Sequence, residues 1–139
     1  MADSNTPDLA RRKPVFGEQK AIASNVKTGE DPITGTTVNA MTTIYSAADR
    51  RVERNAGIYI LIRNTGATND LNFQVQGRLT GTAASSNITL VGSTIVQESD
   101  NSGIITLHPA IRTFIVQVQS AVAGSATTYE LQTCYAPVT

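Results

Sequence analysis

Side chains suited to acid–base, nucleophilic or metal chemistry are scarce in this sequence. It contains one histidine, His108, and one cysteine, Cys134. No Cys, Asp or Glu lies within several residues of His108, so the sequence offers neither a triad nor a ligand set around it. A nucleophilic cysteine needs a nearby base or positive dipole that stabilises the thiolate, and the residues beside Cys134 provide none. We therefore expect structural roles for both residues and no enzymatic activity.

A cluster of charged residues precedes the first strongly apolar segment. It combines three arginines with two carboxylates: Asp49, Arg50, Arg51, Glu53 and Arg54. The cluster is compatible with an anion site, but solvated ion pairs at the edge of a domain are the more common arrangement, and we favour them. An enzyme site built from Asp49, Arg50, Glu53 and His108 is the least favoured interpretation.

The segment Asp100–Gly103 is rich in oxygen atoms that could serve as calcium ligands. It lacks the alternating carboxylates and the distal glutamate of an EF-hand, so we interpret it as a turn. The single cysteine also excludes an intrachain disulfide and a multi-cysteine zinc site. We predict neither a metal ion nor a cofactor.

The charge balance and the aromatic content argue against several classes of partner. Eleven basic side chains balance 11 acidic ones, whereas a nucleic-acid-binding domain carries a basic excess that displaces counterions. The same neutrality removes electrostatic attraction to an anionic membrane, and apolar runs such as Ile58–Ile62 are too short to span one. Aromatic residues make up 5% of the chain, with no tryptophan. That content argues against the aromatic platforms of glycan and single-strand binders.

From about Met41 onward the sequence has the period of β-strands. Apolar and polar residues alternate along Leu71–Gln76, Ile111–Gln119 and Thr128–Tyr135, and Gly57–Arg63 is apolar on both faces, as in a central strand. Shorter strands are expected at Ile88–Val91, Thr94–Gln97 and Ile104–His108. The side chains expected to point into the core are Leu71, Phe73 and Val75, then Phe114, Val116 and Val118, and finally Tyr129, Leu131 and Thr133. We predict an all-β domain over residues 41–139, an antiparallel β-sandwich or jelly-roll-like fold of about seven or eight strands.

Residues 1–40 have a different composition. They contain every lysine of the chain, three of its five prolines and scattered aliphatic residues without a strand or helix period. So little apolar surface does not offset the entropy of ordering the segment, and we predict an extended N-terminal arm that is disordered or is ordered by another chain. Such arms bind by main-chain pairing and by placing isolated apolar residues in pockets. The residues expected to anchor it on a partner are Leu9, Arg11, Arg12, Lys13, Val15, Phe16, Ile22 and Val26.

Uncharged amide side chains are expected on the outer faces of the strands. They are Asn72, Gln74, Gln76, Gln117 and Gln119. Such groups form hydrogen bonds across a subunit contact at a lower desolvation cost than charges. A neutral sandwich with polar faces and a long arm is typical of a protein that assembles with others. The acidic, polar first residues lead into no hydrophobic segment, so we expect no secretory signal and synthesis in a host cytoplasm.

Two stretches combine these strand and turn patterns in a specific order. In Ile58–Asn69 a buried strand ends in an Asn-Thr-Gly turn, and the next strand, Leu71–Arg78, ends beside a glycine. Arg112–Ser120 begins with arginine and precedes a Gly/Ser loop, Ala121–Ser125. Together they resemble small β-sandwich modules of structural proteins of tailed bacteriophages, over roughly residues 50–136. A tryptophan that related modules carry is replaced here by Ala83–Asn87.

With the arm included, the sequence is most similar to head decoration (cement) proteins. The resemblance implies a viral structural protein, expected as a homotrimer, that binds the major capsid protein on the outer surface of the phage head. It would stabilise contacts between capsid subunits against internal DNA pressure, and its location would be the exterior of the virion. The partners would be capsid subunits and other copies of itself, with no nucleic acid and no membrane. The alternative is a phage tail-fibre or lectin-like module that recognises a host surface glycan.

Overall fold

The alternating segments assemble into two antiparallel sheets that face each other across an apolar core. The computed structural model describes residues 28–29, 31–47, 56–79 and 87–137. Within these ranges the strands are β1 (Thr28–Gly29), β2 (Ile33–Thr36), β3 (Thr42–Ala47), β4 (Ala56–Asn64), β5 (Leu71–Arg78), β6 (Ile88–Val96), β7 (Ile105–Leu107), β8 (Thr113–Ser120) and β9 (Thr128–Pro137).

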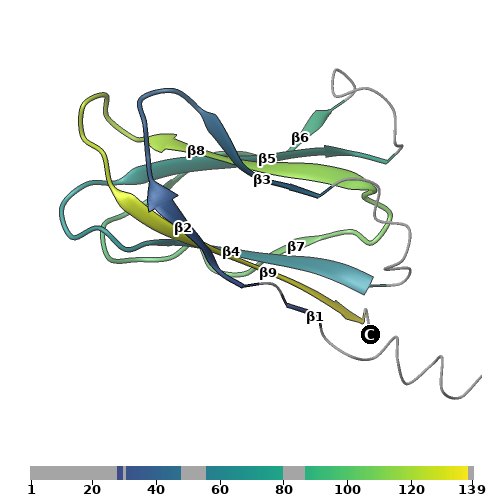
Figure 1. The fold of residues 1–139 in the computed structure, drawn as a ribbon. Helices are drawn as coiled ribbons and strands as arrows, with labels where there is room; N and C mark the ends of the chain where they lie inside the picture. Colours follow the sequence, from purple (N-terminus) through teal and green to yellow (C-terminus); the bar gives the residue numbers. More distant parts are fainter. Residues whose placement is uncertain (1–27, 30, 48–55, 80–86, 138–139) are drawn as a thin grey trace, which may run out of the picture.

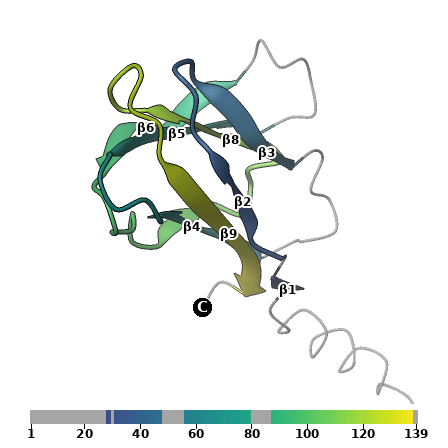
Figure 2. The same cartoon turned by 60° about the vertical axis from the view of Figure 1, so that its left-hand side comes forward.

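The two sheets have different strand orders (Figures 1 and 2). The first sheet has the order β1-β9-β4-β7, and β2 also pairs with β9, while the second has the order β3-β8-β5-β6. From β2 onward, every connection except the one between β5 and β6 passes from one sheet to the other. The described chain therefore has the predicted all-β, antiparallel sandwich architecture.

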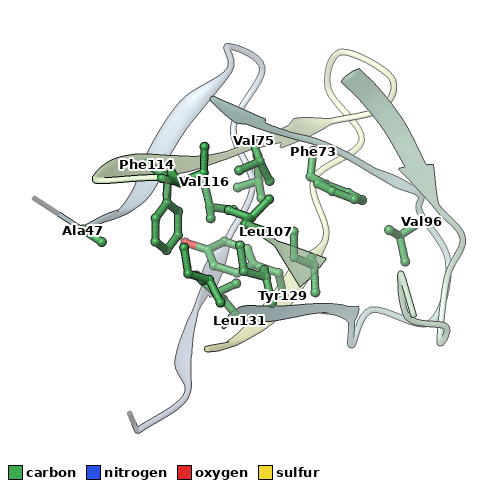
Figure 3. Packing of buried hydrophobic residues seen from close by; sticks show 14 of the residues in the cluster. Ala47, Phe73, Val75, Val96, Leu107, Phe114, Val116, Tyr129 and Leu131 are labelled. Atoms are coloured by element: carbon green, nitrogen blue, oxygen red, sulfur yellow. The ribbon is translucent and has the colours of Figure 1, made fainter. Parts of the chain in front are cut away.

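The core is filled by the alternate residues of the strands (Figure 3). Along β5, each buried residue is followed by a half-buried one over the whole strand. All three sets of side chains expected to point inward on β5, β8 and β9 are buried. On β4, Ile58, Ile60 and Ile62 are fully buried, whereas Tyr59 and Leu61 are half-buried on the outer face. The period-2 pattern thus predicted the core correctly, because burial between two sheets requires it.

Strand β6 differs from the prediction of two short strands. It is continuous from Ile88 to Val96 but is irregular where it pairs with β5. Gly92 and Ser93 together lie opposite the single residue between Phe73 and Val75, and Leu90 is an additional residue further along. These β-bulges interrupt the polar–apolar alternation, so the sequence pattern of one strand was interpreted as two.

Part of the segment predicted as an arm belongs to the sandwich. In β1, Thr28 pairs with Tyr135, and β2 pairs with Thr128–Leu131 at the same edge of β9. Three residues, including Pro32, separate β1 from β2 on this edge, whereas only two residues separate their partners on β9. The pairing is therefore interrupted at Pro32. The predicted boundary near residue 40 is therefore corrected for residues 28–36, which have too little period to reveal an edge strand. Residues 1–27 lie outside the described residues.

A glycine opposite a tyrosine completes the contact between β2 and β9. Gly35 pairs with Tyr129, and a Cβ atom at position 35 would lie 2.5 Å from the Tyr129 hydroxyl oxygen. The tyrosine ring therefore occupies the space above Gly35 that a side chain would fill. Burial raises the pKa of the Tyr129 phenol above its ordinary value of 10.0.

The raised pKa of Tyr129 predicts a loss of stability in alkali. Below pH 10 the phenol is protonated in both states, so its contribution is constant. As the pH rises above 10, the unfolded chain ionises first, and the free energy of unfolding falls until the native phenol also ionises. Urea unfolding of the wild type and of Tyr129→Phe at pH 8 to 11.5 should show a smaller alkaline decline in the variant. An equal alkaline decline in the free energy of unfolding of both proteins would contradict a raised pKa of Tyr129.

The fully buried strand β4 predicts a large effect of truncating its core side chain. Ile60→Ala removes a side chain with 0% exposure, and the cavity should lower the free energy of unfolding by about 2–5 kcal/mol. Ile95→Ala, at a position that is 53% exposed, is the matched control and should change it by less than about 0.5–1 kcal/mol. Urea denaturation followed by tyrosine fluorescence measures both. Similar losses would show that Ile60 is not part of a close-packed core.

Candidate interaction surfaces

The outer face of the β3-β8-β5-β6 sheet is covered by amide side chains that bond to one another. The Gln74 Nε2 group donates to Gln117 Oε1 at 2.6 Å, and Asn72 Nδ2 donates to Gln119 Oε1 at 3.4 Å. The second pair is extended by the Ser93 hydroxyl, which donates to Asn72 Oδ1 at 2.7 Å. These residues lie on the outer face as predicted. Much of their hydrogen-bonding capacity is already used within the chain, which makes this surface polar but locally satisfied.

Both amide rows continue beyond β8, one to β3 and the other to the connection that precedes β3. Gln117 Nε2 donates to Thr43 Oγ1 at 3.2 Å, and Gln119 Nε2 donates to the Asn39 carbonyl oxygen at 3.0 Å. Asn39 Oδ1 in turn accepts the backbone N–H of Gly124 at 2.8 Å. The rows therefore fix the amide side chains across neighbouring strands, in the manner of cross-strand pairs that stabilise a sheet.

The outer face of the other sheet contains a mostly apolar hollow. A groove of 450 Å³ crosses β9 and β4 between the β2 edge and the start of β7. We call it the apolar groove and define it by its lining residues: Pro32, Tyr59, Ile60, Leu61, Ile104, Gln132, Thr133 and Cys134. Ile104 at its rim is 73% exposed, the largest value among the exposed large hydrophobic residues of the described chain. The groove lining contains no charged residue and is mostly apolar, so it offers shape and apolar area to a partner.

The two residues considered first for chemistry have ordinary surroundings. His108 is exposed, and its Nδ1 atom accepts the backbone N–H of Ala110 at 2.9 Å within a turn. Cys134 is half-buried on the outer face of β9, opposite to the inward-pointing Tyr129 and Leu131. Among the residues that the structure describes, no group of three or more His, Cys, Asp or Glu side chains is placed to hold a metal ion.

A second, polar hollow of 260 Å³ lies at the end of β4. It is lined by Arg63, Asn64, Thr65, Ser99, Asp100 and Asn101. Arg63 forms an ion pair with Glu130 at 2.7 Å. Asp100 Oδ1 and Asn101 Oδ1 accept backbone N–H groups of their own turn, from Asn101 and Gly103. The segment Asp100–Gly103 is therefore a turn stabilised by its own side chains.

Asn64 does not face this hollow as a free ligand because its amide is used completely. The buried side chain donates from Nδ2 to the carbonyl oxygens of Asn69 at 2.8 Å and Val96 at 3.1 Å. Its Oδ1 accepts the backbone N–H of Gly66 at 3.1 Å and the Thr127 hydroxyl at 2.7 Å. Two donors and two acceptor positions are the whole capacity of the group.

The hydrogen bonds continue from Asn64 into the other sheet. Thr127 also accepts the backbone N–H of Thr37 with its carbonyl at 2.8 Å and donates its own N–H to Thr37 Oγ1 at 3.0 Å. Thr37 Oγ1 and Ser120 Oγ are 2.9 Å apart. Asn64, Thr127, Thr37 and Ser120 are all buried, and we call them the polar network. It closes the end of the sandwich at which the connections β2–β3, β4–β5, β6–β7 and β8–β9 lie.

The residues that the sequence selected for partner binding cannot be compared with these surfaces. Leu9, Arg11, Arg12, Lys13, Val15, Phe16, Ile22 and Val26 lie outside the described residues, as do the charged residues 49–54. The polar network and the apolar groove were not predicted. The only sequence signal for the network was the Asn-Thr-Gly turn at Asn64–Gly66, which was interpreted as a loop. The described part of the chain contains no helix that could cross a membrane.

Comparisons with known proteins identify the fold. No protein-family model and no curated protein matches the sequence. PirA matches with a TM-score of 0.57 and 17% identity, over 73% of this chain and 92% of its own. At this identity, the similarity to PirA concerns the fold alone. A Yersinia pseudotuberculosis-derived mitogen matches with a TM-score of 0.52 and 8% identity, over 78% of this chain and 86% of the mitogen. A protein of Bacillus endospore appendages, which form disulfide-linked pili, matches with a TM-score of 0.50 and 15% identity, over 82% and 88% of the two chains.

The polar network predicts a cost for removing a single hydroxyl. Thr127→Val keeps the shape of the side chain but leaves Asn64 Oδ1 without its shortest hydrogen bond, so the free energy of unfolding should fall by about 1–3 kcal/mol. The neighbouring Thr128→Val is the control, because Thr128 Oγ1 bonds to Thr65 Oγ1 at an exposed position. That change should cost less than about 0.5 kcal/mol. Equal urea midpoints for both variants would refute a stabilising network.

Proposed function

We propose that this chain is a non-enzymatic structural protein, a decoration (cement) protein that binds the outer surface of a phage head and stabilises contacts between major capsid protein subunits. The observation that carries the proposal is the antiparallel pairing of β1 and β2 with β9. It fixes the chain that follows residues 1–27 to an interior strand of the sheet. In this proposal the N-terminal segment binds neighbouring subunits and the sandwich holds it in place.

The pairing is suited to carrying tension. A pull along the strand axis on the chain before Thr28 loads the paired segments Thr28–Gly29 and Ile33–Thr36 in shear. Strand β9 is in turn paired with β4 at every position from Ala56 to Asn64. Force applied to β1 and β2 is thus distributed over β9 and β4, whose inward side chains are buried in the core. A protein that links capsid subunits through its N-terminal segment requires this kind of attachment.

The described surface also supports assembly more than catalysis or charge-driven binding. One outer face is a set of mutually bonded amides, and the other is the apolar groove. Both surfaces can pack against a partner without burying unpaired charges, which are costly to desolvate. The fold itself does not decide the function, since similar sandwiches occur in a mitogen as well as in pili of endospores.

Glycan recognition, the alternative, has less support from the described aromatic residues. Phe73, Phe114, Tyr129 and Tyr135 are buried, and Tyr45 packs against Phe114 with ring centroids 5.7 Å apart. Sugar rings are commonly held on exposed aromatic faces. None of the described aromatic residues is exposed: Tyr45, which packs against Phe114, and Tyr59, in the apolar groove, are half-buried.

The proposed function predicts that the N-terminal segment is needed for binding to heads. Deletion of residues 1–27 leaves β1 and β2 in place, and it should weaken binding to expanded heads of the tailed phage that encodes the chain by at least about tenfold. Quantitative co-sedimentation measures the binding, and the melting temperature of the heads measures the stabilisation. Deletion of residues 1–8 is the control and should preserve both, because it keeps every residue expected to anchor the segment.

Two outcomes would contradict the proposal in different ways. Equal binding by the full chain and the variant that lacks residues 1–27 would remove the role of the N-terminal segment. Absence of head binding by the full chain, together with binding to purified host surface polysaccharide, would replace capsid decoration by glycan recognition. Circular dichroism of both deletion variants must first show the same β-sheet spectrum and the same thermal unfolding.

A further inference from the structure

The apolar groove runs across the strands and not along them. It extends from Pro32 on the β2 edge, over Gln132 and Cys134 of β9 and Tyr59 and Leu61 of β4, to Ile104. Three strand spacings of about 4.8 Å make a span of about 14 Å. An extended peptide of about four or five residues covers that distance. The volume of 450 Å³ accommodates a large side chain from such a peptide.

The N-terminal sequence contains a short segment of matching chemistry. Pro14-Val15-Phe16-Gly17 places two apolar residues, including the only aromatic residue before Tyr45, between a proline and a glycine. It follows the basic run Arg11–Lys13. The groove itself is lined by uncharged residues, and Asp31, the residue before Pro32 in the chain, is exposed. Residues 14–17 therefore offer apolar side chains that match the groove lining, and the preceding basic run is opposite in charge to Asp31.

The direction of β1 favours a segment from another molecule. Thr28 lies opposite Tyr135 and Gly29 opposite Cys134, so the chain, followed toward its N-terminus, points along β9 toward Pro137. That direction leads away from the groove, whose residues nearest to β1 are Cys134, opposite Gly29, and Tyr59. To reach its own groove, the chain would have to reverse and then cross the sheet. Twelve residue steps separate Thr28 from Phe16, so without a reversal Phe16 can lie up to about 40 Å from Thr28, far enough to meet a neighbouring molecule.

We infer that the apolar groove binds residues 14–17 of a second copy of this chain, with Phe16 inserted between Tyr59, Leu61 and Cys134. The groove and the segment then form a heterologous contact, in which each copy donates a segment and accepts another. Repetition of the contact closes a ring of copies or continues along a surface. This inference goes beyond head binding, because it concerns contacts between copies and is tested in the absence of a capsid.

The single native cysteine makes the contact testable by cross-linking. In a Phe16→Cys variant, the introduced thiol would lie beside Cys134 of the neighbouring copy. Equal amounts of ¹⁵N-labelled and unlabelled full-length variant are mixed, equilibrated and oxidised mildly, and tryptic peptides that join positions 16 and 134 are quantified by mass spectrometry. We expect peptides that combine one labelled and one unlabelled partner, at least tenfold more abundant than in the control Leu9→Cys.

A second variant tests the groove itself. Ile104→Glu places a charge at the rim at a position that is 73% exposed, so the sandwich should keep its thermal unfolding temperature. In the Phe16→Cys background, this change should lower the yield of mixed-isotope peptides at least tenfold, whereas Ile95→Glu, on the other sheet, should leave it unchanged.

Each contrary result overturns the inference. Cross-links found only within one isotope would show that the chain occupies its own groove. A yield from Phe16→Cys no higher than that from Leu9→Cys, or one insensitive to Ile104→Glu, would show that the groove does not bind this segment. Head binding by the wild type could still be intact in all of these cases, so the failure of this inference is distinguishable from failure of the proposed function.

Discussion

A single buried amide forms hydrogen bonds to several segments at the end of the sandwich where the chain repeatedly crosses between the sheets. Asn64 terminates β4, and its side chain holds the following turn, the end of β6 and the hydroxyl of Thr127 before β9. A buried polar group that loses a partner costs about 1–3 kcal/mol. The positions of these three segments are consequently coupled, since a shift of any one leaves the amide unsatisfied. Thr37 and Ser120 then extend the coupling to the second sheet.

The coupling also explains why a glycine follows Asn64 closely. A Cβ atom at Gly66 would overlap the Thr127 hydroxyl oxygen. The backbone of the turn can donate to Asn64 Oδ1 only because nothing occupies that space. The Asn-Thr-Gly turn thus combines a buried acceptor with a residue that permits close approach, and the two requirements belong to one packing arrangement.

Sequence periodicity predicted the two sheets and the core of this protein. It did not predict the polar network, the apolar groove or the edge strands β1 and β2. Leu71, Phe73 and Val75 were assigned to the core because burial between sheets imposes a period of two. The polar network escaped because its members are distant in sequence: Thr37 and Thr127 are 90 residues apart. The apolar groove depends on which strands are neighbours, and no pattern within one strand contains that information. Strands β1 and β2 were missed because an edge strand needs little apolar alternation when its main chain supplies the pairing.

The two outer faces also divide the possible interactions by type. The amide face has its hydrogen-bonding groups largely committed within the chain, whereas the apolar groove has area to bury. The groove lining contains no charged residue, and the amide rows are uncharged. Contacts through the amide face should consequently depend weakly on ionic strength, because screening acts on charges. A partner would be selected mainly by shape and by the apolar residues that it supplies.

The irregular strand β6 has a consequence for the behaviour of the protein in concentrated solution. It forms an edge of the second sheet and runs from Ile88 to Val96 without a charged residue or a proline. A straight edge of this composition would be a template for aggregation. The bulges at Leu90 and at Gly92–Ser93 twist the edge and put its free N–H and C=O groups out of the regular spacing. A second strand cannot pair regularly along its full length, so the bulges oppose aggregation through this edge without the charges that other edge strands use.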